Sequence, residues 1–137
     1  MQRRNRLTFI ALNVSDLAKS LQFYRDVLGF PLHDASHDSD LNDPWYGGEH
    51  AAHSWTDGAF IHFALYPARE PHRPTTTSVQ VGFHVDEFEA VHIRVVRSGA
   101  VVVQEPRVEP WGETARYLDP DGNIVSVTAY SSEKAQA

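Results

Sequence analysis

His62 is the side chain of this sequence best suited to moving a proton at neutral pH. An imidazole has an ordinary pKa near 6.5, and His62 stands within the largely apolar segment AFIHFALY, residues 59–66. Two hypotheses follow: His62 acts as a general base, or it forms a hydrogen bond to a ligand or a water molecule. His84 lies nearer the end of its own segment, and the sequence identifies no carboxylate partner for either histidine.

Arg116, three residues before Asp119, is a candidate for binding an anionic group. A guanidinium can hold a carboxylate or a phosphate with two parallel hydrogen bonds. An arginine in a strand also commonly pairs with an acid at the edge of a sheet. The sequence leaves both interpretations of Arg116 open.

The segment from His33 to Trp55 concentrates histidines, aspartates and aromatic residues. It lacks the fixed ligand spacing that would hold a metal ion, so we interpret it as a solvated loop. Its rings, Trp45, Tyr46 and Trp55, can stack on a planar ligand, and they can equally fill the interface of a dimer. Trp111 has the same two interpretations.

The elements that must position these side chains occur twice. Residues 7–14 and 78–85 alternate between apolar and other side chains, which predicts strands. Ser15 and Asp86 are then predicted to cap helices. The predicted helices have apolar stripes that end at a glycine: Leu17, Leu21, Tyr24, Leu28 and then Gly29; Phe88, Val91, Val95 and then Gly99.

Strand-like segments follow each helix, and DPDGN, residues 119–123, is predicted to turn between the last two strands. The sequence therefore predicts an α+β fold of two βαβββ modules that form a half-open, barrel-like cleft. One domain, residues 1–137, has four expected parts: module one at about 7–67, a linker at about 68–77, module two at about 78–130 and a tail at 131–137. The expected strands after the helices are 31–35, a loop-rich stretch ending near Trp55, and 59–66 in module one, and 100–105, 114–118 and 123–130 in module two.

Strand alternation sorts the side chains into two faces. One face is aliphatic or aromatic and predicts the core against the helices: Ile10, Leu12, Val14, Ile61, Phe63, Leu65, Val79, Val81, Phe83, Val85, Val125 and Val127. The other face mixes small, apolar and polar residues and predicts the lining of a ligand cleft. It includes Phe9, Phe60, His62, Gln80 and Ser126.

Two stretches of the chain resemble the vicinal oxygen chelate superfamily, which includes glyoxalase I, extradiol dioxygenases and bleomycin-resistance proteins. NVSDLAKSLQFYRDVLGF, residues 13–30, is similar to the opening signature of that superfamily, and YLDPDGNIVSV, residues 117–127, to its closing signature. The likeness spans about residues 7–130. It implies paired βαβββ modules around a cleft and, in many members, a divalent metal ion held by four strands.

The resemblance places the four metal-ligand positions on Phe9, His62, Gln80 and Ser126. Only His62 and Gln80 could coordinate an ion, both as weak neutral donors, and no carboxylate compensates its charge. The resemblance therefore implies a metal-free binding protein of the bleomycin-resistance type, with no cofactor. The predicted ligand-binding residues are Phe9, Phe60, His62, Gln80, Arg116, Ser126, Trp45 and Trp55. The alternatives are a metal-dependent lyase or dioxygenase that uses His62 and Gln80, and a metal-free isomerase with His62 as its base.

The composition limits the partners of the chain. Twelve basic and eighteen acidic residues give a formal net charge of −6, which disfavours binding to nucleic acid or to an anionic membrane surface. No apolar run is long enough for a membrane helix, and no cysteine is present for a disulfide or a thiolate. We expect a cytoplasmic protein that binds a small molecule and, as the resemblance implies, forms a homodimer.

Overall fold

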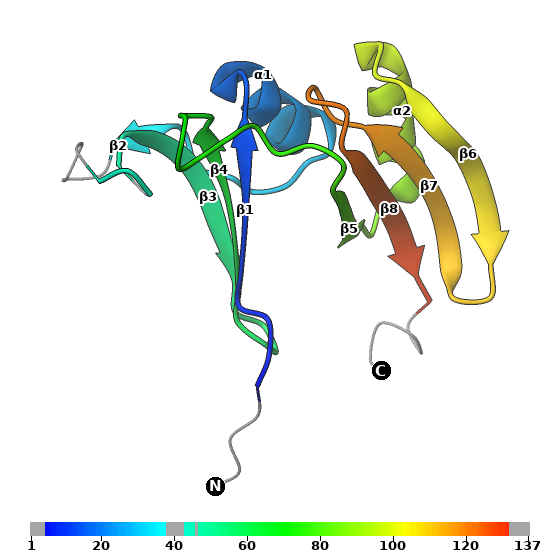
Figure 1. Cartoon of the computed structure of the whole chain (residues 1–137). Helices are drawn as coiled ribbons and strands as arrows, with labels where there is room; N and C mark the ends of the chain where they lie inside the picture. Colours follow the sequence, from blue (N-terminus) through cyan, green and yellow to red (C-terminus); the bar gives the residue numbers. More distant parts are fainter. Residues whose placement is uncertain (1–4, 38–42, 46, 132–137) are drawn as a thin grey trace, which may run out of the picture. The chain divides into compact units, whose positions relative to one another are not determined.

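The computed structural model describes residues 5–37, 43–45 and 47–131, and the chain divides into two compact units (Figure 1). The first unit comprises Met1–Leu21 and Pro31–Thr75, and the second comprises Gln22–Phe30 and Thr76–Ala137. Each unit contains a four-stranded sheet, ordered β1-β4-β3-β2 in the first and β5-β8-β7-β6 in the second. The predicted α+β fold of two βαβββ modules is confirmed. Of the predicted tail, residues 132–137 lie outside the described residues.

The first unit is built on strands β1 (Phe9–Val14), β2 (Ser36–His37), β3 (Glu49–Trp55) and β4 (Ile61–Pro67) and on helix α1 (Leu17–Leu21). β1 pairs with β4 in parallel, and β3 pairs with both β2 and β4 in antiparallel fashion. Of the predicted core face in this unit, Leu12, Val14, Phe63 and Leu65 are buried, whereas Ile10 and Ile61 are half-buried. At the start of α1 the carboxylate of Asp16 accepts a hydrogen bond from Lys19 N at 3.1 Å.

Two predictions for the middle of this unit are wrong. Residues 31–35 form no strand, and the short β2 begins only at Ser36. The expected strand near Trp55 is present as β3, Glu49–Trp55, so the interpretation of the whole 33–55 segment as a solvated loop is wrong for these seven residues. β3 forms because Ala51–Trp55 pair with β4 and Glu49 and His50 pair with β2, which satisfies backbone groups that a loop would leave to water.

The second unit begins with a π-helical segment, η1 (Gln22–Val27). The sequence assigns residues 22–30 to module one, yet this segment packs within the second unit. The ring of Phe30 stacks on that of Phe83 with 3.9 Å between centroids, and Arg94 Nε donates a hydrogen bond to Val27 O at 2.8 Å. The end of the first helical region therefore belongs to the core of the second unit.

The remaining elements of the second unit are β5 (Gln80–His84), α2 (Phe88–Ser98), β6 (Val102–Glu109), β7 (Gly112–Leu118) and β8 (Ile124–Tyr130). The predicted stripe of α2 is buried, and the helix ends at Gly99, whose φ of 82° suits glycine. The predicted cap is wrong, because Asp86 Oδ1 instead accepts a hydrogen bond from His84 Nε2 at 2.9 Å. Within the described residues, no helix is long and apolar enough to cross a membrane.

The turn between β7 and β8 is organised by the buried carboxylate of Asp119. Its Oδ1 accepts hydrogen bonds from the backbone N–H groups of Asp121 (2.9 Å) and Asn123 (2.8 Å). Its Oδ2 accepts one from the hydroxyl of Tyr24 at 2.7 Å and one from the amide of Asn123 at 3.2 Å. The predicted turn thus also anchors η1 to the sheet of the second unit.

The stability of the protein is expected to fall between pH 10 and pH 12, partly through Tyr117. Burial, helped by the negative charge of Glu105, raises the pKa of Tyr117 to about 12 from an unfolded value near 10. The neutral phenol therefore contributes its full stabilisation below pH 10 and loses it as the pH rises through 12, by about 2 kcal/mol. Urea unfolding at pH 9, 10, 11 and 12 measures this loss.

The control for this prediction is a pair of tyrosine variants. Tyr117→Phe removes the titrating group, and it should make the alkaline loss smaller than in the wild type. Tyr130→Phe changes an exposed tyrosine and should leave the loss unchanged. If Tyr117→Phe loses as much unfolding free energy at alkaline pH as the wild type does, the assignment of this loss to Tyr117 is wrong.

Candidate functional site

In the first unit, Phe9, His62 and Ser54 form one row across three strands. Phe9 on β1 and Ser54 on β3 are both register partners of His62 on β4. The rings of Phe9 and His62 stack with centroids 5.5 Å apart and planes inclined by 11°. Ser54 Oγ lies 2.6 Å from His62 Nδ1, a strong hydrogen bond in either direction. The structure thus brings together Phe9 and His62, which the sequence predicted to share a face.

The surroundings of His62 favour its neutral form. Burial lowers the pKa of His62 below its ordinary value of 6.5, and the nearby histidines His50, His33 and His53 lower it further. A neutral imidazole has one donor and one acceptor nitrogen. Because Ser54 is hydrogen-bonded to Nδ1, Nε2 is the ring nitrogen that can bond to a ligand. If the serine hydroxyl donates to Nδ1, Nε2 carries the proton and donates; if Nδ1 donates to the serine, Nε2 accepts.

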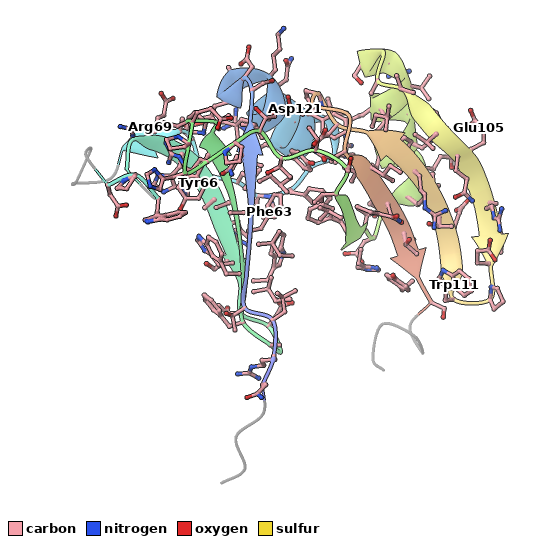
Figure 2. The ribbon with its side chains drawn as sticks, in the orientation of Figure 1. Phe63, Tyr66, Arg69, Glu105, Trp111 and Asp121 are labelled. Carbon is pink, nitrogen blue, oxygen red and sulfur yellow. The ribbon has the colours of Figure 1, made fainter. Side chains whose placement is uncertain are left out.

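The next two rows of this face have different chemistry. Ala11, Ala64 and Ala52 follow one another across β1, β4 and β3. The third row includes Tyr66 on β4 (Figure 2). Its ring stacks on that of His50 with centroids 5.3 Å apart and lies 5.6 Å from the guanidinium carbon of Arg73. The small alanines thus separate two rows that carry rings.

The other aromatic residues predicted to bind a ligand in this unit differ in their exposure and in the face of the sheet on which they lie. Phe60, immediately before β4, is 44% exposed, and Phe9 is 40% exposed. Trp55 is the register partner of Ile61, so strand alternation places it on the face opposite to His62. Trp45 is 56% exposed, and its ring meets the edge of His72 with 4.8 Å between centroids. Tyr46 lies outside the described residues.

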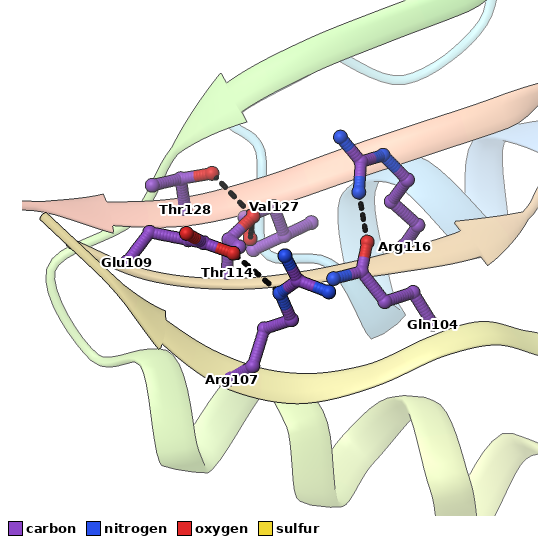
Figure 3. A network of polar contacts seen from close by, with 7 residues as sticks. All are labelled: Gln104, Arg107, Glu109, Thr114, Arg116, Val127 and Thr128. Atoms are coloured by element: carbon purple, nitrogen blue, oxygen red, sulfur yellow. Dashed lines mark hydrogen bonds and ion pairs between the residues drawn. The ribbon is translucent and has the colours of Figure 1, made fainter. Parts of the chain in front are cut away.

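In the second unit, Ser126 and Arg116 stand in a row with Gly82 and Gln104. Gly82 pairs with Ser126, Ser126 with Arg116, and Arg116 with Gln104, across strands β5, β8, β7 and β6. Arg116 Nη1 donates a short hydrogen bond to Gln104 Oε1 (Figure 3). Arg116 therefore meets a neutral amide on the edge strand, where the sequence suggested an acid. Gln80 is exposed at the start of β5, opposite Ile124.

The polar network continues beside this row. Arg107 Nε donates to Glu109 Oε1 in a short ion pair, and the hydroxyls of Thr114 and Thr128 lie 2.8 Å apart (Figure 3). Glu109 is thus committed to Arg107. In the parts of the chain that are described, no carboxylate forms an ion pair with Arg116.

The donor set does not fit the divalent ion of the metal-dependent superfamily members. Phe9 has no donor atom, Ser126 has only a neutral hydroxyl, and His62 Nδ1 already bonds to Ser54. Among the described residues, no group of three or more His, Cys, Asp or Glu side chains could hold a metal ion. The chemistry of this set suits hydrogen bonding and ring stacking instead.

Sequence reasoning missed Ser54 and Gln104. Ser54 lies in the expected strand near Trp55, but the sequence did not indicate the register that pairs Ser54 with His62. Gln104 was placed in a predicted strand, yet the pairing of β6 with β7 shifts register on both sides of it. No pattern in a single sequence predicts such a shift.

The sequence comparison agrees with the fold and with the two signatures. A family model described as the Glyoxalase/Bleomycin resistance protein/Dioxygenase superfamily matches residues 6–127, and the chain belongs to this superfamily. No match was found among curated protein sequences.

Solved structures show the same fold along nearly the whole chain. TnmS3, an antibiotic binding protein from Streptomyces sp. CB03234, matches with a TM-score of 0.69 and 24% identity over 96% of this chain and 100% of its own. A glyoxalase/dioxygenase from Nostoc punctiforme matches with a TM-score of 0.67 and 22% identity over 92% of this chain and 91% of its own. The virulence protein STM3117 from Salmonella typhimurium matches with a TM-score of 0.61 and 26% identity, covering 95% and 100%.

Proposed function

We propose that this protein binds a small, planar organic molecule without a metal ion. The observation that carries this proposal is the exposure of two phenylalanines: Phe9, whose ring stacks on that of His62, and Phe60, which precedes His62 by two residues. Both residues are about two-fifths exposed, so each presents aromatic surface that a planar ligand can cover. His62 and Ser54 would add a hydrogen bond that orients the ligand.

The superfamily contains both binding proteins and enzymes, so the ligand class is proposed from the residues of this chain. TnmS3 is described as an antibiotic binding protein, which supports a binding role for a chain of the same fold. The convergence of Phe9 and His62 with Gln80 and Ser126, the homodimer and the cytoplasmic location stay predictions.

A thermal-shift screen tests this function. Protein treated with EDTA and then dialysed is mixed with a library of planar and amphiphilic compounds, and the melting temperature is recorded. At a concentration 100 times its Kd, a ligand stabilises the folded state by about 2.7 kcal/mol, a readily measured shift. We expect several compounds with Kd below about 1 mM, equally with and without added Zn²⁺, Mn²⁺ or Fe²⁺. A binder that requires a metal would favour the lyase or dioxygenase alternative, and no binder would contradict the proposal.

Replacing both exposed phenylalanines is expected to weaken these binders. The double variant Phe9→Ala, Phe60→Ala should raise the Kd by about tenfold, because each stacked ring contributes about 0.5 to 1.5 kcal/mol. The control, Ile93→Ala, alters a side chain on α2 that is 40% exposed like Phe9, and it should leave the Kd unchanged. Isothermal titration measures the three proteins. Equal affinities in the double variant and the wild type would exclude the stacking role.

A further inference from the structure

We propose that Ser54 is a nucleophile that takes acyl groups from aryl esters, with His62 as its general base. Both side chains belong to the first unit, on the paired strands β3 and β4. This role rests on the proposed function and deepens it, because it assigns a ligand class, aryl esters, and a reaction to the same surface.

The hydrogen bond between Ser54 and His62 has the geometry of a nucleophile and its base. Ser54 Oγ lies 2.6 Å from His62 Nδ1, a distance at which a base can take the proton of a hydroxyl. The two residues are register partners in antiparallel strands, so the backbone holds their side chains together on one face. Both residues are half-buried, so neither is closed off from a ligand.

The imidazole of His62 has the protonation state and the orientation that a base requires. Burial and the three neighbouring histidines lower the pKa of His62 below its ordinary value of 6.5, so the ring is neutral at pH 7. The ring of Phe9 stacks on that of His62 and thereby holds the plane in which Nδ1 meets Ser54. A base that is itself held in place by a third group is the arrangement that activates serine nucleophiles.

The surroundings of the pair favour esters of phenols. Phe9 and Phe60 present aromatic surface on which an aryl group can stack. The pKa of a phenol, about 10, is far below that of an alcohol, so its anion leaves an acyl group readily. An aryl ester therefore needs less stabilisation of its oxyanion intermediate than an alkyl ester or an amide does.

The reaction is the hydrolysis of the ester in two steps. Ser54 Oγ forms a bond to the carbonyl carbon while its proton passes to His62 Nδ1. The bond to the phenol oxygen then breaks, the phenol takes the proton from Nδ1, and the acyl group stays on Ser54. Water attacks this acyl group and gives a proton to Nδ1, the bond to Ser54 Oγ breaks, and Oγ regains a proton as the carboxylic acid leaves.

Release of nitrophenolate from p-nitrophenyl acetate tests this role. Ser54→Ala and His62→Asn should each lower the rate at pH 7 by about a hundredfold, the usual contribution of a positioned base and its nucleophile. The wild-type rate should fall as the pH is lowered through the pKa of His62, below 6.5, because a protonated imidazole cannot accept the proton. Wild-type protein quenched in acid during the first turnover should carry an acetyl group on Ser54, located by mass spectrometry.

Two controls measure the reaction of ordinary side chains with the ester. His84→Asn removes an imidazole whose side chain is 42% exposed, and Ser98→Ala removes a hydroxyl that donates to Val95 O; neither should change the rate. Ser54→Cys keeps a nucleophile of similar size, and it should retain acetylation at this position. Because the chain has no other cysteine, the modified thiol is unique.

The possible outcomes separate this role from the proposed function. Equal rates in Ser54→Ala and the wild type, or an acetyl group on another side chain in place of Ser54, would overturn the nucleophile. Planar compounds that still bind in the thermal-shift screen would leave the proposed function standing. Loss of the rate in Ser54→Ala, with its melting temperature close to that of the wild type and acetylation retained in Ser54→Cys, supports the nucleophile.

Discussion

Replacing Asp119 by alanine is expected to lower the free energy of unfolding by about 3 to 4 kcal/mol. The carboxylate is buried and accepts four hydrogen bonds, two of them from backbone N–H groups in the turn. Alanine would leave those groups and the hydroxyl of Tyr24 without their acceptor in a water-poor environment. Urea unfolding at pH 7 measures the loss.

Three further variants distinguish the loss of the four hydrogen bonds to Asp119 from the general effect of removing an acid. Asp26→Ala removes a carboxylate that is 55% exposed and paired with Arg25, and it should cost less than about 0.5 kcal/mol. Tyr24→Phe should cost about 1 to 2 kcal/mol. The double variant Tyr24→Phe, Asp119→Ala should lose less than the sum, because the two side chains share one hydrogen bond. A loss below about 1 kcal/mol in Asp119→Ala would show that the cluster is not structural.

The closing signature of the superfamily therefore has a structural role in this chain. Asp119 was predicted from turn chemistry alone, and the hydrogen bonds of the turn agree with that prediction. The bond to Tyr24 could not be predicted, since it joins residues 95 positions apart in the chain. A sequence pattern indicates which side chains a turn requires, but not which distant segment packs against it.

Strand alternation predicted the two faces of each sheet, because a period of two fixes them without any knowledge of neighbours. The buried Leu12 and Phe63 and their opposite-facing neighbours, Phe9 and His62, bear this out. Pairing between strands was not predictable in the same way. Ser54 reaches His62, and Gln104 reaches Arg116, through registers that depend on β3 being a strand and on the irregular pairing of β6.

Replacing Gly82 by isoleucine is expected to abolish ligand binding without destabilising the protein. Isoleucine suits a strand, and glycine in a strand interior costs about 0.5 to 1 kcal/mol relative to alanine, so the urea midpoint should stay constant or rise. The branched side chain would occupy the space beside Ser126, a predicted ligand-binding residue. We expect the Kd of every wild-type binder to rise at least about a hundredfold, because the side chain would fill space that the ligand needs beside Ser126.

Gly82→Ala is the matched control for this experiment. A single methyl group meets Ser126 at ordinary contact distance, so it should change the Kd by less than about threefold. A large loss of affinity with isoleucine and little change with alanine would place the ligand beside Gly82 and Ser126, on β5 and β8. If the isoleucine variant binds as the wild type does, ligands do not reach Gly82 and Ser126.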